Sequence, residues 1–331
     1  MKPGSGPPWG ITAFHSALDP AGTQAVHTAS LWWLFFWVCT AVFVAVLFAI
    51  GLALIRGRSR NTPPDRKPDE ASEHRRTLAV LGAIGATVAI LFGLLIADFL
   101  VGRGIDSTGA PPDAQPLAID LTGHQWWWEI RYRDPIPANL VRTANEIHLP
   151  VGRTVRLTLD SVDVIHSLWI PNLSGKRDLV PGHPVETWLH PDREGIFRGP
   201  CAEFCGLQHA NMTLVVVVES QAAFDAWLAN ARRPAVEPTD ALARQGRDLF
   251  LARTCVLCHA ISGTPAFGAV GPDLTHFGGR AMFGAAFANT PDRLAEWIAD
   301  PAQFKPGVLM PATPLDEDER RALAAYLESL K

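Results

Sequence analysis

The chain has 331 residues, of which 48% are hydrophobic and 19% are charged, and its formal net charge is −4. This near-neutral balance excludes a basic nucleic-acid-binding surface, and five cysteines are too few for a scaffold held together by disulfides. The length is enough for about two domains of ordinary size.

Two segments are long and apolar enough to cross a membrane. Residues 31–55 and 77–97 contain no charged residue. As helices they would extend about 38 and 32 Å, which exceeds the roughly 30 Å of a bilayer's hydrocarbon core. Runs of this length favour membrane spans over buried core helices. We expect a transmembrane helical hairpin over residues 31–100, with spans at about 31–55 and 77–99.

The residues before the first span form a polar tail, over 1–30, that lacks the cationic start of a secretory signal. The loop between the spans carries seven cationic residues, whereas the tail carries one. Cytoplasmic loops are enriched in Lys and Arg. We therefore expect a two-pass protein of the bacterial inner membrane with both termini on the periplasmic side. The cationic residues of the loop are Arg56, Arg58, Arg60, Arg66, Lys67, Arg75 and Arg76.

Residues 101–230 have the pattern of an all-β domain. Leu157 and Leu159 alternate with polar residues, as in a strand with one buried face. Residues 212–218 form a β-branched apolar run that is typical of a strand buried on both faces. Short strands separated by Pro and Gly favour a sandwich or a barrel.

The last part of the chain, residues 240–331, has helical patterns and follows a Pro-containing linker over 231–239. We expect its last helix to begin at Pro314, with a capping box formed by Thr313 and Asp316. The helices predicted after the β domain are 220–232, 240–253, 291–300 and 314–330.

Two thiols, an imidazole and a thioether lie within twelve residues, at Cys201, Cys205, His209 and Met212. A further imidazole, His166, is expected at the end of a strand that begins near residue 154. Thiolate, thioether and imidazole ligands together favour copper, and this spacing is not that of a zinc finger. A structural disulfide between the two cysteines is the alternative.

A mononuclear blue-copper site needs one Cys, and this segment offers two. Two bridging thiolates would hold two coppers side by side and share one unpaired electron between them. Such an arrangement suits electron transfer, because the geometric change is spread over two metals.

These motifs resemble those of subunit II of the haem–copper cytochrome c oxidases, whose cupredoxin domain carries the binuclear CuA centre. The resemblance covers residues 31 to about 230. The matching segments are Asp163-Val-Ile-His166-Ser167, Lys176, Asp178, Pro181-Gly182, the Cys201–Met212 segment and Gly123-His-Gln-Trp126-Trp127-Trp128.

The resemblance implies a role for each of these side chains. Cys201 and Cys205 would bridge the coppers, His166 and His209 would be terminal ligands, and Met212 would be a weak ligand.

Two further roles follow from the same resemblance. The Glu203 backbone carbonyl would bind copper, and its carboxylate would reach a Mg²⁺ ion at the interface with subunit I. Trp126 matches the tryptophan through which the family accepts electrons, and aromatic packing beside Trp127 and Trp128 is the alternative for this residue.

Cys255-Val-Leu-Cys258-His259 is the C-x-x-C-H attachment motif of a c-type haem. The two thiols add to the haem, and the histidine becomes an axial ligand. Methionine often supplies the other axial ligand and raises the potential. Met310, which precedes a proline, is the predicted ligand, and Met282 is the alternative.

Residues 240–331 resemble class I cytochromes c, and the segment from Asn289 to Pro311 resembles the fused cytochrome c domain of caa3-type oxidases. In such domains the first and last helices cross closely. Gly246 and Phe250 on the first helix and Tyr326 on the last would lie at this crossing.

The resemblance implies a multi-domain membrane protein with a two-helix hairpin, a cupredoxin-like domain and a cytochrome c domain. It would be a subunit of a respiratory cytochrome c oxidase that passes electrons from its haem c to CuA and on to subunit I, which reduces O₂. Subunit III and a donor cytochrome, or a quinol:cytochrome c reductase, would be its other partners. The alternatives are the electron-accepting subunit of a nitric oxide reductase, or a membrane-anchored copper-binding or electron-carrier protein without an oxidase partner.

Overall fold

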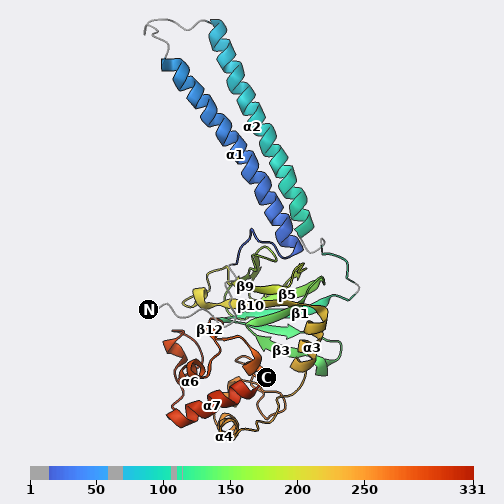
Figure 1. Ribbon diagram of the computed structural model, residues 1–331, viewed down its shortest axis with the longest axis vertical. Helices are drawn as coiled ribbons and strands as arrows, with labels where there is room; N and C mark the ends of the chain where they lie inside the picture. The colour runs from blue at the N-terminus through green and yellow to red at the C-terminus, as the bar shows by residue number, and fades with distance from the viewer. Residues whose placement is uncertain (1–14, 59–69, 106–109, 114) are drawn as a thin grey trace. The chain divides into compact units, whose positions relative to one another are not determined.

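The computed structural model describes residues 15–58, 70–105, 110–113 and 115–331 (Figure 1). It contains a helical hairpin and a folded part made of a β domain and a helical domain. Residues 1–14 of the predicted polar tail (1–30) and three cationic residues of the hairpin loop, Arg60, Arg66 and Lys67, lie outside the described residues.

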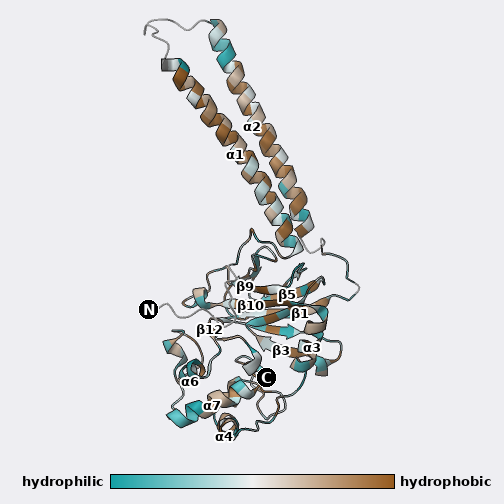
Figure 2. Cartoon of the chain, viewed as in Figure 1, coloured by the Kyte–Doolittle hydropathy of each residue, from teal (hydrophilic) through white to brown (hydrophobic). Residues whose placement is uncertain are grey.

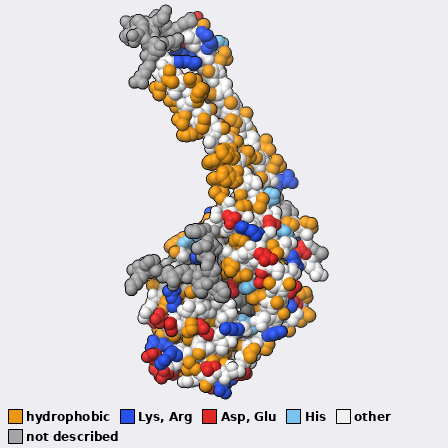
Figure 3. All heavy atoms as spheres, viewed as in Figure 1, with side chains coloured by type: hydrophobic (Ala, Val, Ile, Leu, Met, Phe, Trp, Pro, Cys, Tyr) orange, Lys and Arg blue, Asp and Glu red, His pale blue; other side chains and the backbone are white. Residues whose placement is uncertain are grey.

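The hairpin consists of α1 (Thr23–Arg58) and α2 (Glu70–Ile105). Their most apolar windows have mean hydropathies of 2.9 and 2.5, and none of either window is buried. Figure 2 shows that apolar residues predominate along both helices, and Figure 3 shows Lys and Arg side chains gathered where α1 ends and α2 begins. Both helices extend beyond the predicted spans, because their polar flanks continue the helical backbone.

The β domain is a sandwich of two sheets. In the larger sheet the order is β3-β2-β1-β5-β8, and β1 pairs with β5 in parallel while the other pairs are antiparallel. In the smaller sheet β10 lies between β4, its parallel neighbour, and the antiparallel β9. The strands are β1 (Leu117–His124), β2 (Trp127–Tyr132), β3 (Val141–Ala144), β4 (Glu146–Pro150), β5 (Val155–Ser161), β8 (Val185–Leu189), β9 (Gly195–Pro200) and β10 (Thr213–Glu219).

The inward faces of both sheets form one apolar core, as the alternation of the sequence predicts. Leu157 and Leu159 of β5 are buried, and so are Trp128 and Ile130 of β2. The prediction of an all-β, cupredoxin-like domain is therefore confirmed. A short 3-10 helix, η2 (Pro137–Asn139), connects β2 to β3.

His166 does not end the strand that starts near residue 154, so this prediction was wrong. β5 ends at Ser161, and His166 begins a separate strand, β6 (His166–Leu168), which pairs with β7 (Arg177–Leu179). The chain turns between them because the Ser161 hydroxyl donates to the Val164 carbonyl (2.5 Å) and the Val164 amide donates to Asp163 (2.7 Å). These local hydrogen bonds compete with continued strand pairing.

The chain leaves the β domain through α3 (Gln221–Ala231), which Ser220 caps. The helical domain then begins at α4 (Ala241–Ala252), which Asp240 caps. Its remaining elements are α5 (Cys255–Cys258), η4 (Phe277–Gly279), β11 (Met282–Phe283), β12 (Phe287–Ala288), α6 (Pro291–Ala299), η5 (Pro301–Gln303) and α7 (Glu317–Ser329).

The first and last helices of this domain, α4 and α7, cross closely at Gly246. A Cβ atom at this position would overlap the backbone of Ala322. The rings of Phe250 and Tyr326 meet with their centroids 5.9 Å apart. The glycine therefore lets the backbones approach, and the aromatic pair fills the crossing, as the sequence predicted.

The predicted start of α7 was wrong. The helix begins at Glu317, and Asp316 is its N-cap, accepting from the Glu319 amide (2.8 Å) while the Glu319 carboxylate accepts from the Asp316 amide (3.2 Å). Thr313 makes no part of this capping box, because its amide donates to the Ala299 carbonyl. An Asp followed three residues later by Glu forms the better reciprocal cap.

Candidate metal and haem sites

Two loops of the β domain bring five predicted ligands together. His166 opens β6, while Cys201, Cys205, His209 and Met212 lie between β9 and β10, with His209 at the start of η3 (His209–Asn211). The bridge that pairs Leu168 with Cys201 holds the two loops side by side.

The donor atoms are close enough to share metal ions. The sulfurs of Cys201 and Cys205 are 3.9 Å apart and not bonded, so the structure does not contain the alternative disulfide. Nδ1 of His166 is 3.9 Å from the Cys201 sulfur, and Nδ1 of His209 is 3.6 Å from the Cys205 sulfur. The Met212 sulfur lies 3.9 Å from that of Cys205.

This donor set fits copper by its chemistry and its surroundings. His166 and Met212 are fully buried, both cysteines are buried, and His209 is half-buried. Two thiolates, two imidazoles and a thioether suit soft copper ions better than Mg²⁺ or Ca²⁺. His166, Cys201 and Cys205 also form a potential metal-binding cluster by proximity alone.

Asp163 orients His166, a role that was not predicted from the sequence. The carboxylate accepts from Nε2 of His166 (2.9 Å), which leaves the Nδ1 lone pair directed at Cys201. The same carboxylate accepts from the Gln125 amide (2.7 Å). A carboxylate behind a ligating histidine fixes its tautomer and orientation. An Asp three residues before the histidine was the available signal.

The pKa values of the two thiols of the site are shifted in opposite directions. A hydrogen bond from the Cys205 thiol lowers the pKa of Cys201 to about 3, and a hydrogen bond from the Ser167 amide acts in the same direction. The neighbouring thiolate raises the pKa of Cys205. The pair therefore favours one thiolate even before a metal binds, and the thiolate is the form that ligates metals.

The two groups of Glu203 have different surroundings. Its backbone carbonyl lies 3.3 Å from the Cys201 sulfur, at the edge of the donor cluster. The residue itself is exposed, so its carboxylate is available to an ion or to another protein.

Trp126 lies directly against the cysteine loop. Its indole Nε1 donates to the Cys205 carbonyl (2.8 Å), and the Gln125 side chain donates to the same oxygen (2.7 Å). Trp126 is only 6% exposed. Its ring is thus joined by one hydrogen bond to the backbone of a predicted copper ligand, whereas the sequence offered no role for Gln125.

The helical domain holds a second set of ligands. Cys255 and Cys258 begin and end α5, and both thiols are free and half-buried. His259 follows immediately, and its Nδ1 donates to the Pro272 carbonyl (2.8 Å). Burial lowers the pKa of this imidazole, so it stays neutral with its Nε2 lone pair available.

Glycine is required beside this histidine, because a Cβ atom at Gly271 would lie 2.7 Å from the imidazole ring. Two thiols, a neutral imidazole with one oriented nitrogen and a glycine against its ring fit the attachment of a c-type haem.

The two candidate methionines lie in different surroundings. Met310 lies in the loop between η5 and α7 and is half-buried. Met282 lies in β11, where it pairs with Ala288. No hydrogen-bonding contact within the described residues joins either of them to His259, so the choice of Met310 stays a prediction.

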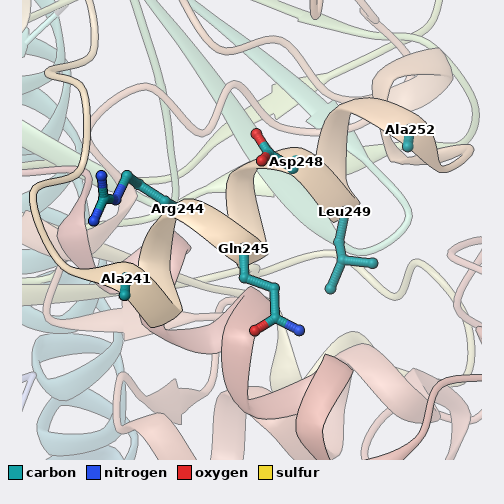
Figure 4. A pocket seen from close by; sticks show the side chains of 6 residues that line it. All are labelled: Ala241, Arg244, Gln245, Asp248, Leu249 and Ala252. Carbon is teal, nitrogen blue, oxygen red and sulfur yellow. The ribbon is translucent and has the colours of Figure 1, made fainter.

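A shallow open hollow also lies on the outer face of α4. Figure 4 shows that all six lining side chains come from this one helix. They include neither a cysteine nor a histidine, and the hollow is not part of the candidate sites. The lining residues are Ala241, Arg244, Gln245, Asp248, Leu249 and Ala252.

Two known families match this chain. Residues 135–220 match the family described as cytochrome C oxidase subunit II, periplasmic domain, and residues 243–331 match the cytochrome c family. Both matches lie on the domains that carry the two candidate sites.

The chain is 33% identical to cytochrome c oxidase subunit 2 of Alkalihalophilus pseudofirmus over 325 residues, which cover 96% of this chain and 91% of that protein. It is 34% identical to the subunit 2 of Bacillus sp. (strain PS3) over 233 residues, which cover 66% of this chain and 64% of that protein. Among solved structures, the periplasmic domain of subunit II of cytochrome oxidase from Bradyrhizobium japonicum is 31% identical, with 37% of this chain and 96% of that chain covered and a TM-score of 0.34.

Proposed function

Because this chain belongs to the cytochrome c oxidase subunit 2 family and carries a fused cytochrome c domain, we propose that it accepts electrons at a covalent haem c and delivers them through CuA to subunit I, where O₂ is reduced to water. The observation that carries this proposal is the buried cluster of His166, Cys201, Cys205, His209 and Met212. The chain itself is thus a subunit of an oxidoreductase that gains its oxygen-reducing site from a partner.

Cys201, Cys205, His166 and His209 would hold the copper pair, with Met212 and the Glu203 carbonyl as weaker ligands. Asp163 keeps His166 in one tautomer, and burial excludes water from the thiolates. Cys255 and Cys258 would attach the haem, and His259 and Met310 would ligate its iron. When bound, the copper pair and the haem iron each supply a one-electron redox couple, which the side chains lack.

Pro272 has a positioning role in the helical domain, which we call the haem domain. Its carbonyl accepts the Nδ1 proton of His259, so the other ring nitrogen carries the lone pair that a metal needs. The hydrogen bond also makes the imidazole a stronger electron donor to a metal.

The family and the two apolar helices make this a membrane-anchored protein. We place the hairpin loop in the cytoplasm and both folded domains in the periplasm, because Arg56, Arg75 and Arg76 flank the loop. The exposed Glu203 carboxylate would bind Mg²⁺ at the contact with subunit I. Subunit III and a donor cytochrome, or a quinol:cytochrome c reductase, complete the proposed set of partners.

Rapid photoreduction of the haem in the purified oxidase complex tests the electron path. We expect haem oxidation and the change in the copper absorption band to occur with the same rate constant. The Cys205→Ser variant should lose copper and leave the haem reduced for far longer. A wild-type haem that oxidises without any change at copper would contradict the path, and turnover with NO instead of O₂ would assign the chain to a nitric oxide reductase.

A further inference from the structure

The loop that leads to Met310 packs directly on the β domain, which we call the copper domain. Three consecutive residues of this loop, Lys305, Pro306 and Gly307, contact three residues beside the copper ligands, Trp126, Leu207 and Gln208. We call this set of six residues the docking contact. It joins the part of the haem domain that precedes its predicted axial ligand to the part of the β domain that surrounds Cys205.

Lys305 is the centre of the docking contact. Its side chain is 2% exposed, and its ammonium donates to the carbonyls of Trp126 and Gly284, both at 2.7 Å. Within the described residues it has no carboxylate partner at ion-pair distance. Burying an ammonium is costly unless hydrogen bonds compensate. The cost is visible here, because burial lowers the pKa of Lys305 to about 8.

One of the two carbonyls belongs to each domain. Gly284 lies between β11 and β12 of the haem domain, whereas Trp126 lies between β1 and β2 of the copper domain. If the domains separated, the ammonium would lose its acceptor from the copper domain. Lys305 therefore couples the position of the Met310 loop to that of the Trp126 backbone.

The neighbouring residues of the loop extend the contact. Gln208 stands between two predicted copper ligands in the sequence. Its buried side chain donates to the Pro306 carbonyl (3.0 Å). Gly307 has a φ of +88°, and a Cβ atom there would lie 3.2 Å from both the Trp126 ring and the Leu207 side chain. The loop thus approaches Trp126 at van der Waals distance and covers its ring.

A second contact between the domains lies away from this loop. The Glu146 carboxylate on β4 accepts from the Ala281 amide of the haem domain (3.0 Å). The two contacts fix the haem domain at separate points, so they restrict rotation of one domain on the other.

We propose that Lys305 is a positioning residue that holds the haem domain against Trp126, so that Trp126 accepts electrons only from this chain's own haem. From the Met310 loop the route crosses the Gly307–Trp126 contact, then follows the indole hydrogen bond to the Cys205 carbonyl and the backbone to the Cys205 sulfur. A diffusing carrier cannot reach Trp126 while the loop covers it, and must deliver its electron to the haem domain. This inference rests on the proposed function.

The first test measures the accessibility of Trp126 in the full-length complex by hydroxyl-radical oxidation and mass spectrometry. In the wild type we expect Trp126 to be oxidised as slowly as Trp188, which is 1% exposed. Lys305→Met keeps the apolar stem and removes the donor, and the oxidation rate of Trp126 should rise about tenfold, because hydrogen bonds to charged groups are among the stronger ones. The exposed Arg293→Met is the matched control and should change nothing. A Trp126 rate that is high in the wild type, or unchanged in Lys305→Met, would overturn the proposal.

The second test measures internal electron transfer after photoreduction of the haem. Lys305→Met should slow haem-to-copper transfer about tenfold, while the haem absorption spectrum and the copper resonance spectrum stay unchanged. An unchanged transfer rate would overturn the role of Lys305. If the wild type shows no transfer at all, the proposed function fails instead, so the two failures are distinguishable.

Lys305→Met also removes the hydrogen bond to Gly284 and so could disturb the loop itself. Glu146→Ala is a second variant that avoids this effect. This variant removes a docking acceptor from the copper domain and leaves the haem domain unaltered. It should also raise Trp126 oxidation and slow internal transfer. If it does neither, the docked arrangement itself is refuted.

Discussion

Two of the proposed histidine ligands each have one neighbour that fixes the orientation of the imidazole ring. Asp163 does so for His166, and the Pro272 carbonyl does so for His259. The two arrangements differ in charge, because a carboxylate stands behind one ring and a neutral carbonyl behind the other. A carboxylate donates more electron density through the ring and so favours the higher oxidation state of a bound metal.

Replacing the carboxylate tests this arrangement. Asp163→Asn should lower copper affinity by about ten- to hundredfold, because the amide is a weaker acceptor for Nε2 of His166. Competitive chelator titration of the purified protein measures the change. Asp160→Asn, a half-buried carboxylate on β5, is the control. Equal affinities for the two variants would show that Asp163 does not orient the ligand.

A substitution at Met212 distinguishes the copper site from the haem site. Met212→Leu conserves volume, so the loss of unfolding free energy should stay below about 1.5 kcal/mol. The variant should alter the copper resonance spectrum and leave the haem absorption spectrum as it is. Loss of haem from this variant would contradict the assignment of Met212 to the copper site.

At the scale of elements, the crossing of α4 and α7 depends on one glycine. Gly246→Ala places a methyl group on the Ala322 backbone and should lower the free energy of unfolding of the haem domain by about 3 kcal/mol. Denaturant titration followed by haem absorption measures it. Gly279→Ala is the matched control, because a Cβ atom there meets nothing within 4 Å. Equal effects of the two variants would refute a close crossing.

His148 links β4, β10 and α3. Its imidazole lies between Glu146 (3.3 Å) and Glu219 (2.9 Å) and stacks on Trp227 with the ring centroids 4.1 Å apart. Burial alone would lower the pKa of His148, but hydrogen bonds to the two carboxylates outweigh it and raise the pKa.

A raised pKa means that the charged imidazole stabilises the folded protein at low pH. This contribution is complete below the ordinary pKa of histidine and is lost as the pH rises through the raised value. His148→Gln should therefore lower the free energy of unfolding more at about pH 6 than at about pH 9. Denaturant titration of the full chain at both values measures the difference. A larger loss at the higher pH would contradict the sign.

The sequence predicted most elements and the chemistry of the ligands, because both depend on residues close together in the chain. The alternation around Leu157 and the C-x-x-C-H motif are such local signals. The predicted start of α7 was wrong because two candidate caps overlap in the sequence, and the Asp316–Glu319 pair forms the reciprocal cap while the Thr313 amide donates to the Ala299 carbonyl.

Contacts between distant residues had no signal of this kind. Lys305 and Trp126 are 179 positions apart, and nothing in the local sequence of either residue indicates the other. The same is true of the bridge between Leu168 and Cys201, which holds the two copper-binding loops together. Such contacts follow from the packing of whole elements and domains.

At the scale of the whole molecule, the proposal makes the haem domain both the electron donor and a cover for the copper domain. Fusion makes the encounter of the two sites intramolecular, which raises the effective concentration of the donor to the millimolar range, as an order of magnitude. Docking through Lys305 then fixes the orientation as well as the proximity of the haem domain.

The proposed chain holds a binuclear copper site beside one haem. Mass spectrometric determination of copper and iron in the purified full-length protein measures this ratio. We expect about two coppers for each iron. About one copper for each iron would contradict the bridging roles of Cys201 and Cys205, and iron without copper would leave the β domain with no metal role.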